Sequence, residues 1–262
     1  MATIIEMVNL TRLDSAASSA GIMRQAVTQA TWHCAHRAAF GHRLIDQPLM
    51  ANVLADLALE SEAATALTVR LAGITDRVLG DRADPHDARL RRLGTAVAKY
   101  WICKRTPAHV AEALECLGGN GYVEESMMPR LYREAPLNSI WEGSGNVNCL
   151  DVLRAMRHDG EAAVAFFEEV ALAGGADARL DARVDALRSE FADLDAAEHR
   201  ARRVVEQMAL VLQGSLLVRH APPAVADAFC ASRLGGDWGG AFGTLPRGVD
   251  TAAIVARATP GL

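Results

Sequence analysis

Residues 117–146 read LGGNGYVEESMMPRLYREAPLNSIWEGSGN and contain two glycine-rich turns, one near each end of the segment. The second turn carries a single acid, Glu142, directly before Gly143. Glycine tolerates positive φ and a close approach of the backbone to a flat ligand, and Ser144 is a favoured residue at the start of a helix. The segment therefore predicts a turn that places Glu142 at a helix N-terminus, where its carboxylate is a candidate functional group.

Outside this segment the sequence is typical of an all-α fold. Apolar and small residues recur at helical spacing over residues 7–36, 48–76 and 90–102. Long helical segments joined by short connectors predict an antiparallel bundle of long helices. Pro107 is expected to end or kink the third helix before another helix over residues 108–116, because proline lacks a backbone N–H and clashes with the preceding turn.

The character of the chain changes after residue 159. The second part combines short helices, a charged helix and a glycine-rich loop, expected at residues 161–173, 178–213, from 222 onward and at 235–248. We therefore predict two units: a helical bundle at residues 1–159 and a second helical subdomain, the C-terminal extension, at residues 160–262.

Composition narrows the class of protein. The chain has 262 residues, of which 50% are hydrophobic, so it can bury a large core. Its formal net charge of -5 argues against a wholly basic nucleic-acid-binding module. Five cysteines are scattered singly and are expected to be buried thiols, and the HxxH of His33 and His36 has no acid or cysteine partner for a metal site. No window approaches the roughly 20 apolar residues of a membrane span, so we expect a cytoplasmic protein without membrane contact.

Three segments together resemble the C-terminal helical domain of acyl-CoA dehydrogenases. They are LGGNGY at residues 117–122, LYREAPLNSIWEGSGN at 131–146 and HRAAFGHRLIDQPLMANVLADLALE at 36–60, in the family's order and spacing. The resemblance is closest to the adaptive-response branch, the AidB-type flavoproteins, which share EES, PRLYRE and SIWEGSGN. It implies FAD as cofactor, an acyl-CoA-type thioester as substrate and a homo-oligomer, dimer or tetramer. It also implies that an N-terminal helical domain and a β-domain, which complete the family's site, lie outside this chain.

The resemblance assigns the catalytic residues. In the family, the glutamate before the glycine of the second turn takes the α-proton of the thioester, and this position is Glu142. A weakly acidic α-proton needs a base in a dry site. One subgroup of the family places its base on the first long helix instead, but the matching position here is Thr11. Arg12 matches an arginine that the family keeps near the base, where a cation would favour the ionised carboxylate.

The resemblance also assigns residues to FAD. Arg37 and Phe40 stand in the family's RxxFG segment, which reaches the pyrophosphate and adenine across a subunit boundary, and an arginine fork suits phosphate. Ala38 replaces a glutamine within that segment, and Glu115 replaces another. The full set of expected cofactor contacts is Arg37, Phe40, Glu115, Gly118, Gly119, Ser144 and Asn146.

Trp141 stands where ordinary acyl-CoA dehydrogenases have a tyrosine beside the flavin and acyl chain. The larger indole would narrow the acyl pocket, and core packing is an equally good interpretation. Trp32 and Trp101 lie at apolar helical positions and are expected in the core.

Two other functions are compatible with the sequence. The adaptive-response branch carries a C-terminal extension linked to weak DNA binding, and the arginines that would serve it here are Arg154, Arg157, Arg200, Arg202 and Arg203. Against DNA binding, acids outnumber bases over residues 161–262. The helical domain could alternatively act as an oligomerisation module without chemistry of its own.

Overall fold

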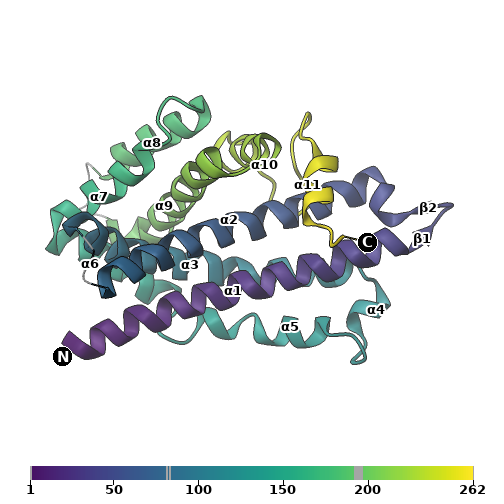
Figure 1. The fold of residues 1–262 in the computed structure, drawn as a ribbon, viewed down its shortest axis with the longest axis horizontal. Helices are drawn as coiled ribbons and strands as arrows, with labels where there is room; N and C mark the ends of the chain where they lie inside the picture. The colour runs from purple at the N-terminus through teal and green to yellow at the C-terminus, as the bar shows by residue number, and fades with distance from the viewer. Residues whose placement is uncertain (1, 81, 83, 192–196, 262) are drawn as a thin grey trace.

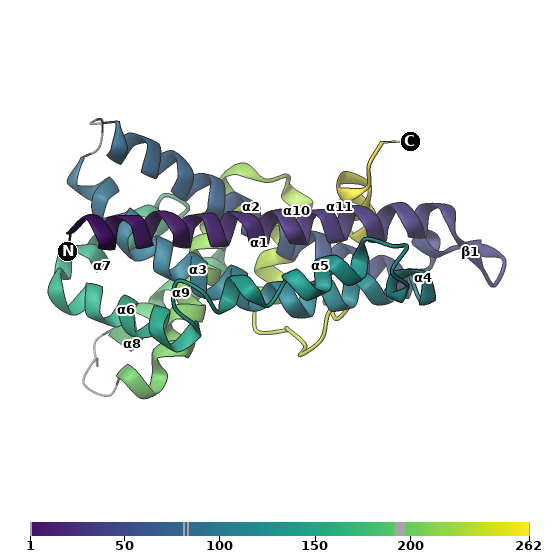
Figure 2. The same ribbon diagram turned by 90° about the horizontal axis from the view of Figure 1, so that it is seen from below.

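Three long helices form the body of the protein in the computed structural model, which describes residues 2–80, 82, 84–191 and 197–261 (Figure 1). They are α1 (Ala2–His36), α2 (Pro48–Leu79) and α3 (Pro85–Glu115). Consecutive helices run in opposite directions along the long axis of the molecule (Figures 1 and 2). The predicted all-α architecture, an antiparallel bundle of long helices, is confirmed.

The start of α3 follows from its local sequence, but its length does not. Asp84 caps the helix by accepting a hydrogen bond from the Asp87 N–H, and Pro85 occupies the first turn, where no N–H is needed. The prediction that Pro107 separates two helices is wrong, because α3 continues through it to Glu115. The helix packs against α1, α2, α6, α7 and α9, and this packing outweighs the loss of one backbone hydrogen bond.

A tight hairpin joins α1 to α2 at one end of the bundle. Its strands β1 (Ala38–Ala39) and β2 (His42–Arg43) pair antiparallel, and a 3-10 turn, η1 (Leu44–Asp46), leads into α2. Phe40 and Gly41 form the tip with φ of 54° and 83°. Two-residue strands are too short to show any alternation, so the sequence did not predict them.

Short elements connect α3 to the extension, which packs along one side of the bundle. The connecting elements are α4 (Gly119–Tyr122), α5 (Met128–Glu134), η2 (Leu137–Ser139) and α6 (Gly145–His158). The extension contains α7 (Gly160–Ala171), α8 (Ala178–Phe191), α9 (Ala197–His220), α10 (Pro223–Phe229), the π-helical turn η3 (Cys230–Leu234) and α11 (Thr251–Ala258).

The single long helix predicted over residues 178–213 is wrong. Arg183 Nη1 in α8 donates to Gln207 Oε1 in α9 at 3.1 Å. In one continuous helix, residues so far apart in sequence would be separated by about 36 Å. The helical pattern continues on both sides of the break without glycine or proline, so only the packing of α8 against α9 reveals the reversal.

One cluster of buried apolar side chains runs through both predicted units, from Leu13 in α1 to Ala258 in α11. The boundary at residues 159 and 160 coincides with the junction of α6 and α7, where the Asp159 side chain accepts a hydrogen bond from the Glu161 N–H and begins α7. The division into two units stays a prediction.

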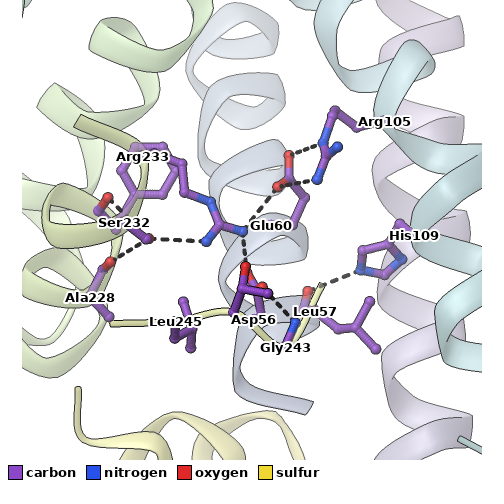
Figure 3. Close-up of polar contacts among 12 residues, drawn as sticks. Asp56, Leu57, Glu60, Arg105, His109, Ala228, Ser232, Arg233, Gly243 and Leu245 are labelled. Atoms are coloured by element: carbon purple, nitrogen blue, oxygen red, sulfur yellow. Dashed lines mark hydrogen bonds and ion pairs between the residues drawn. The ribbon is translucent and has the colours of Figure 1, made fainter. Parts of the chain in front are cut away.

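A buried charged cluster attaches the extension to α2 and α3 (Figure 3). It consists of Asp56 and Glu60 on α2, Arg105 on α3 and Arg233 on η3. Arg233 pairs with Asp56 and donates to Glu60 Oε2 at 3.2 Å, and Arg105 Nε donates to Glu60 Oε1 at 3.2 Å. Burial opposes ionisation of Glu60, but the two arginines outweigh it and lower the pKa of this carboxyl to about 2.

The same cluster holds the glycine-rich loop that follows η3. Asp56 Oδ2 accepts a hydrogen bond from the Gly243 N–H at 2.9 Å, and Asn52 exchanges hydrogen bonds with the backbone of Leu245. Arg105 also lies over the rings of Trp238 and Phe242. The loop is therefore tied to α2 although it has no helix of its own.

The cysteines and tryptophans test two predictions. All five cysteines are buried free thiols, as predicted. Trp101 is buried, but the prediction for Trp32 is wrong, because its side chain is 52% exposed and lies beside His36 at a ring distance of 4.4 Å. A single apolar residue on an outer helix face does not reveal whether a neighbour covers it. None of the described helices has the length and apolarity needed to cross a membrane.

Candidate functional site

The turn that carries Glu142 has an unusual backbone. Glu142 has φ of 56° and Gly143 has φ of 100°, both in the left-handed region. Ser144 is the N-cap residue and α6 begins at Gly145, so the predicted helix start is confirmed. A residue other than glycine in this region costs free energy, and such strain persists where surrounding contacts enforce it.

Three buried side chains enforce this backbone by donating to the carbonyls of the turn. Arg12 Nε donates to the Glu142 oxygen at 3.0 Å, Lys99 Nζ to the Gly143 oxygen at 2.6 Å, and Asn148 Nδ2 to the same oxygen at 2.5 Å. The donors come from α1, α3 and α6, and all three residues are buried. The turn is thus held through its main chain from three directions.

Arg12 is also part of a buried ion pair. Its Nη1 lies 2.6 Å from Asp151 Oδ2, and Arg92 Nη2 lies 2.7 Å from the other carboxylate oxygen. Burial raises the pKa of Asp151, but Arg92 and Arg12 outweigh it, so the net pKa is lowered. The structure therefore places Arg12 beside the Glu142 turn, in contact with its backbone, with Asp151 as the counter-ion.

Glu142 is one of the residues that line a cleft of about 250 Å³ between α1 and the second turn. The residues that line the cleft are Thr11, Asp14, Ser15, Ser18, Asn138, Trp141 and Glu142. Trp141 is 52% exposed, so the core-packing interpretation is wrong and the indole forms part of the cleft wall. Glu142 itself is half-buried. Thr11 donates its hydroxyl to the Met7 carbonyl at 3.1 Å.

The predicted cofactor residues that follow Glu142 lie at the start of α6. Ser144 is exposed and its side chain makes no capping hydrogen bond, which leaves the hydroxyl and the first N–H groups of α6 accessible. Asn146 Oδ1 accepts a hydrogen bond from Arg202 Nε at 2.8 Å. Arg202 belongs to α9, so the extension contacts this end of α6.

The remaining predicted cofactor residues gather at the opposite end of α1. Arg37 and Phe40 belong to the hairpin, and Phe40 at its tip is 95% exposed. Glu115, Gly118 and Gly119 lie at the end of α3 and the start of α4, near the hairpin in Figure 2. Gly118 has φ of 58°, and no atom lies within 4 Å of a β-carbon built on either glycine.

The structure thus separates the candidate residues into two groups. Arg12 and Arg37 flank 24 residues of the same helical segment, and a rise of 1.5 Å per residue places them about 37 Å apart. The two groups are too far apart to hold the same atoms of one dinucleotide. The assigned role of each residue stays a prediction.

The arginines considered for DNA are mostly paired with acids. The pairs are Arg154 with Asp151 at 3.7 Å, Arg157 with Glu198 at 3.7 Å, Arg203 with Glu190 at 4.0 Å, and Arg200 with Glu190. Arg202 is bound to Asn146. This arrangement of alternating charge does not favour a phosphate-binding surface.

Sequence reasoning missed three residues around the site, Lys99, Asn148 and Asp151, and it considered Arg202 only for DNA and not for its contact with Asn146. Lys99 carried a usable signal, because it interrupts the small and apolar run GTAVAKYWIC, and a lysine in such a run has to find a partner on folding. The other three have no local signal, since their partners lie on other helices.

Comparison with known proteins identifies the family. Residues 1–157 match the family model described as the acyl-CoA dehydrogenase C-terminal domain. The chain belongs to the acyl-CoA dehydrogenase family. AidB of Escherichia coli (strain K12), named as an acyl-CoA dehydrogenase relative, is 44% identical over 227 residues, which are 87% of this chain and 41% of AidB.

Other acyl-CoA dehydrogenases extend the comparison. Acyl-CoA dehydrogenase family member 11 of Caenorhabditis elegans is 30% identical over 84% of this chain and 39% of its own length. The solved structure of C. elegans ACDH-11 in complex with C11-CoA has a TM-score of 0.81 and 26% identity over 87% of this chain and 43% of that chain. An acyl-CoA dehydrogenase from Bacillus anthracis, complexed with FAD, shares the fold with a TM-score of 0.62 at 17% identity, covering 97% of this chain and 47% of that one. The chain spans about two fifths of the length of the curated relatives AidB and family member 11.

Proposed function

We propose that this acyl-CoA dehydrogenase domain supplies the proton-accepting side of a flavin-dependent site, with Glu142 as the base. One observation carries the proposal: the carbonyls of the Glu142 turn are bound by Arg12, Lys99 and Asn148, while Glu142 itself lines a cleft. A main chain held so firmly fixes where the carboxylate can reach, which is what a general base requires.

The residues at both ends of the bundle fit a flavin dinucleotide. Ser144 has a free hydroxyl at the N-terminus of α6, a position that suits phosphate or a polar ring edge. At the other end, Gly118 and Gly119 are exposed and open to close approach, and Arg37 is an exposed cation. We propose that the residues at the start of α6 bind the flavin of this subunit. The residues at the hairpin end would contact the cofactor of another copy.

The reaction we propose is oxidation of an acyl thioester. Glu142 takes the proton from the α-carbon, the electron pair of that C–H bond forms the double bond to the β-carbon, and the hydride of the β-carbon leaves. The chemistry that FAD supplies when bound is acceptance of this hydride. Trp141 bounds the acyl chain, and the complex of ACDH-11 with C11-CoA supports a thioester of coenzyme A as the substrate class.

The test is flavin reduction by an acyl-CoA under anaerobic conditions. In the presence of the N-terminal helical domain and β-domain that complete the family's site, we expect Glu142→Gln to retain FAD while reducing it about 10²- to 10⁴-fold more slowly, the range typical of a lost general base. Glu134→Gln, an exposed carboxylate on α5, is the matched control and should react at the normal rate. Equal rates for Glu142→Gln and the unchanged protein would refute the proposal.

Self-association is the second function that a specific observation favours. The hairpin projects from the bundle with Phe40 almost fully exposed at its tip, and Gln47 braces it by donating to the Ala39 carbonyl at 3.1 Å. A braced loop that exposes an aromatic side chain is suited to entering a second subunit. We therefore propose a homo-oligomer, dimer or tetramer, in which this hairpin crosses the subunit boundary.

Light scattering tests the oligomer. We expect a dimer or tetramer, weakened by Phe40→Asp and unaffected by Leu172→Asp, which alters an exposed apolar residue of the extension. A monodisperse monomer for the unchanged protein would rule out this role.

A further inference from the structure

Lys99 is a buried cation without a carboxylate partner. Its side chain lies in the interior at 1% exposure, and Nζ donates to the Gly143 carbonyl at 2.6 Å. Buried lysines are rare and are usually paired with an acid. Among the ion pairs of the residues that the structure describes, none involves Lys99, whereas Arg12 beside it has Asp151.

The choice of lysine is specific to this position. The chain contains only two lysines, Lys99 and Lys104, among 27 basic residues, so arginine is used almost everywhere else. A compact ammonium group on a flexible stem can reach one carbonyl oxygen inside a packed core, whereas a planar guanidinium needs room for five N–H donors. A lysine therefore suits the packed space beside the Gly143 carbonyl of the Glu142 turn.

The titratable groups that influence Lys99 come from three elements. They are Arg12 on α1, Cys103 on α3 and Glu142 in the turn. Burial is the largest influence and lowers the pKa of Lys99, Cys103 raises it, Arg12 lowers it further and Glu142 raises it. Glu142 is the one carboxylate of this group, and it favours the charged form of Lys99.

We propose that Lys99 is a positioning residue of the Glu142 site: its buried ammonium group holds the left-handed turn through the Gly143 carbonyl and so fixes where the Glu142 side chain begins. The inference rests on the proposed function for its catalytic meaning, but the proximity of the two side chains can be measured without any flavin. Loss of the Glu142 charge is expected to lower the pKa of Lys99 further.

The first experiment measures this effect directly. Lys104→Arg leaves Lys99 as the one lysine in the chain, and ¹³C-labelled lysine then reports its titration by NMR. We expect Glu142→Gln in this background to lower the titration midpoint of Lys99, because Glu142 raises the pKa of this lysine. Glu134→Gln is the control and should leave the midpoint unchanged. An unchanged midpoint in Glu142→Gln would overturn the inference whether or not the protein reduces flavin.

The second experiment measures the catalytic consequence. Lys99→Met keeps a similar length and removes both the charge and the donor. We expect flavin reduction at least 10-fold slower with an unchanged half-saturating acyl-CoA concentration, because the site still binds the thioester but no longer places the base. A general loss of structure would raise that concentration as well. A rate equal to that of the unchanged protein would overturn the catalytic part, and absence of flavin reduction in the unchanged protein would refute the proposed function alone.

Discussion

The protein contains two buried polar assemblies that use charge in different ways. In the charged cluster, two arginines face two carboxylates, Asp56 and Glu60, so every charge has an opposite partner. At the Glu142 turn, Lys99 donates to a backbone carbonyl and Arg12 donates both to a carbonyl and to Asp151, while Glu142 lines a cleft. A closed set of charges attaches one part of the chain to another, whereas cations bound to a main chain leave a nearby acid available for chemistry.

The largest expected effect follows from removing one cation of the charged cluster. Arg233→Met leaves Asp56 buried without its cation, and loss of one partner of a buried pair costs about 3–5 kcal/mol. Chemical denaturation should show this loss, with release of the loop that contains Gly243. Arg257→Met, which removes an exposed pair with Glu62, is the control and should cost less than about 1 kcal/mol. Similar losses of unfolding free energy in both variants would show that the charges of the cluster do not depend on one another.

The second effect is the pH dependence of stability. Burial lowers the pKa of His109 from 6.5 to about 4, and the pKa of Glu60 is lowered from 4.5 to about 2. Both folded-state values lie below the unfolded ones, so each contribution is complete above the unfolded pKa and is lost as the pH falls through the folded pKa. Stability should decline from pH 6.5 to 4 through His109 and from 4.5 to 2 through Glu60, each on the order of 3 kcal/mol.

Denaturation at a series of pH values measures this dependence. His109→Gln should remove the decline between pH 6.5 and 4 and preserve the lower one, because the substituted side chain does not titrate. A flat stability curve between pH 4.5 and 2 would contradict the buried, ion-paired character of the charged cluster.

A third effect tests how firmly the Glu142 turn is held. Gly143→Ala combines an unfavourable φ of +100° with a β-carbon 2.9 Å from Val147 Cγ1, and should cost about 1–3 kcal/mol. Gly143→Ala with Val147→Ala removes the crowding and should recover part of the loss. Thermal unfolding compares them with Gly41→Ala, where φ is +83° but no atom lies within 4 Å. If Gly143→Ala costs no more than Gly41→Ala, the packing around the turn is looser than the contacts indicate.

The smallest effect concerns Glu142 itself. Its φ of 56° favours glycine, so Glu142→Gly should be more stable than Glu142→Ala by about 0.5–1 kcal/mol, the reverse of the order inside a helix. Denaturation midpoints of the two variants measure the difference. The opposite order would mean that the left-handed backbone at Glu142 is not maintained in solution.

Local patterns predicted much of the fold because they reflect local physics. The helix start after Ser144 follows from capping, and the long helices follow from periodic apolar residues. The failures share another cause. Pro107 lies within α3, and residues 178–213 divide into two helices, because packing between distant segments decided the outcome in both places.

The sequence by itself determined the all-α class, the position of Glu142 at the start of a helix and the family to which the chain belongs, because these depend on residues close together along the chain. The tertiary structure decided which atoms the surrounding side chains bind, including those of Arg12, which the resemblance had placed near the base. Arg12, Lys99 and Asn148 come from three helices and meet at two carbonyl oxygens, and a contact between residues up to 130 positions apart leaves no periodic signal in a sequence.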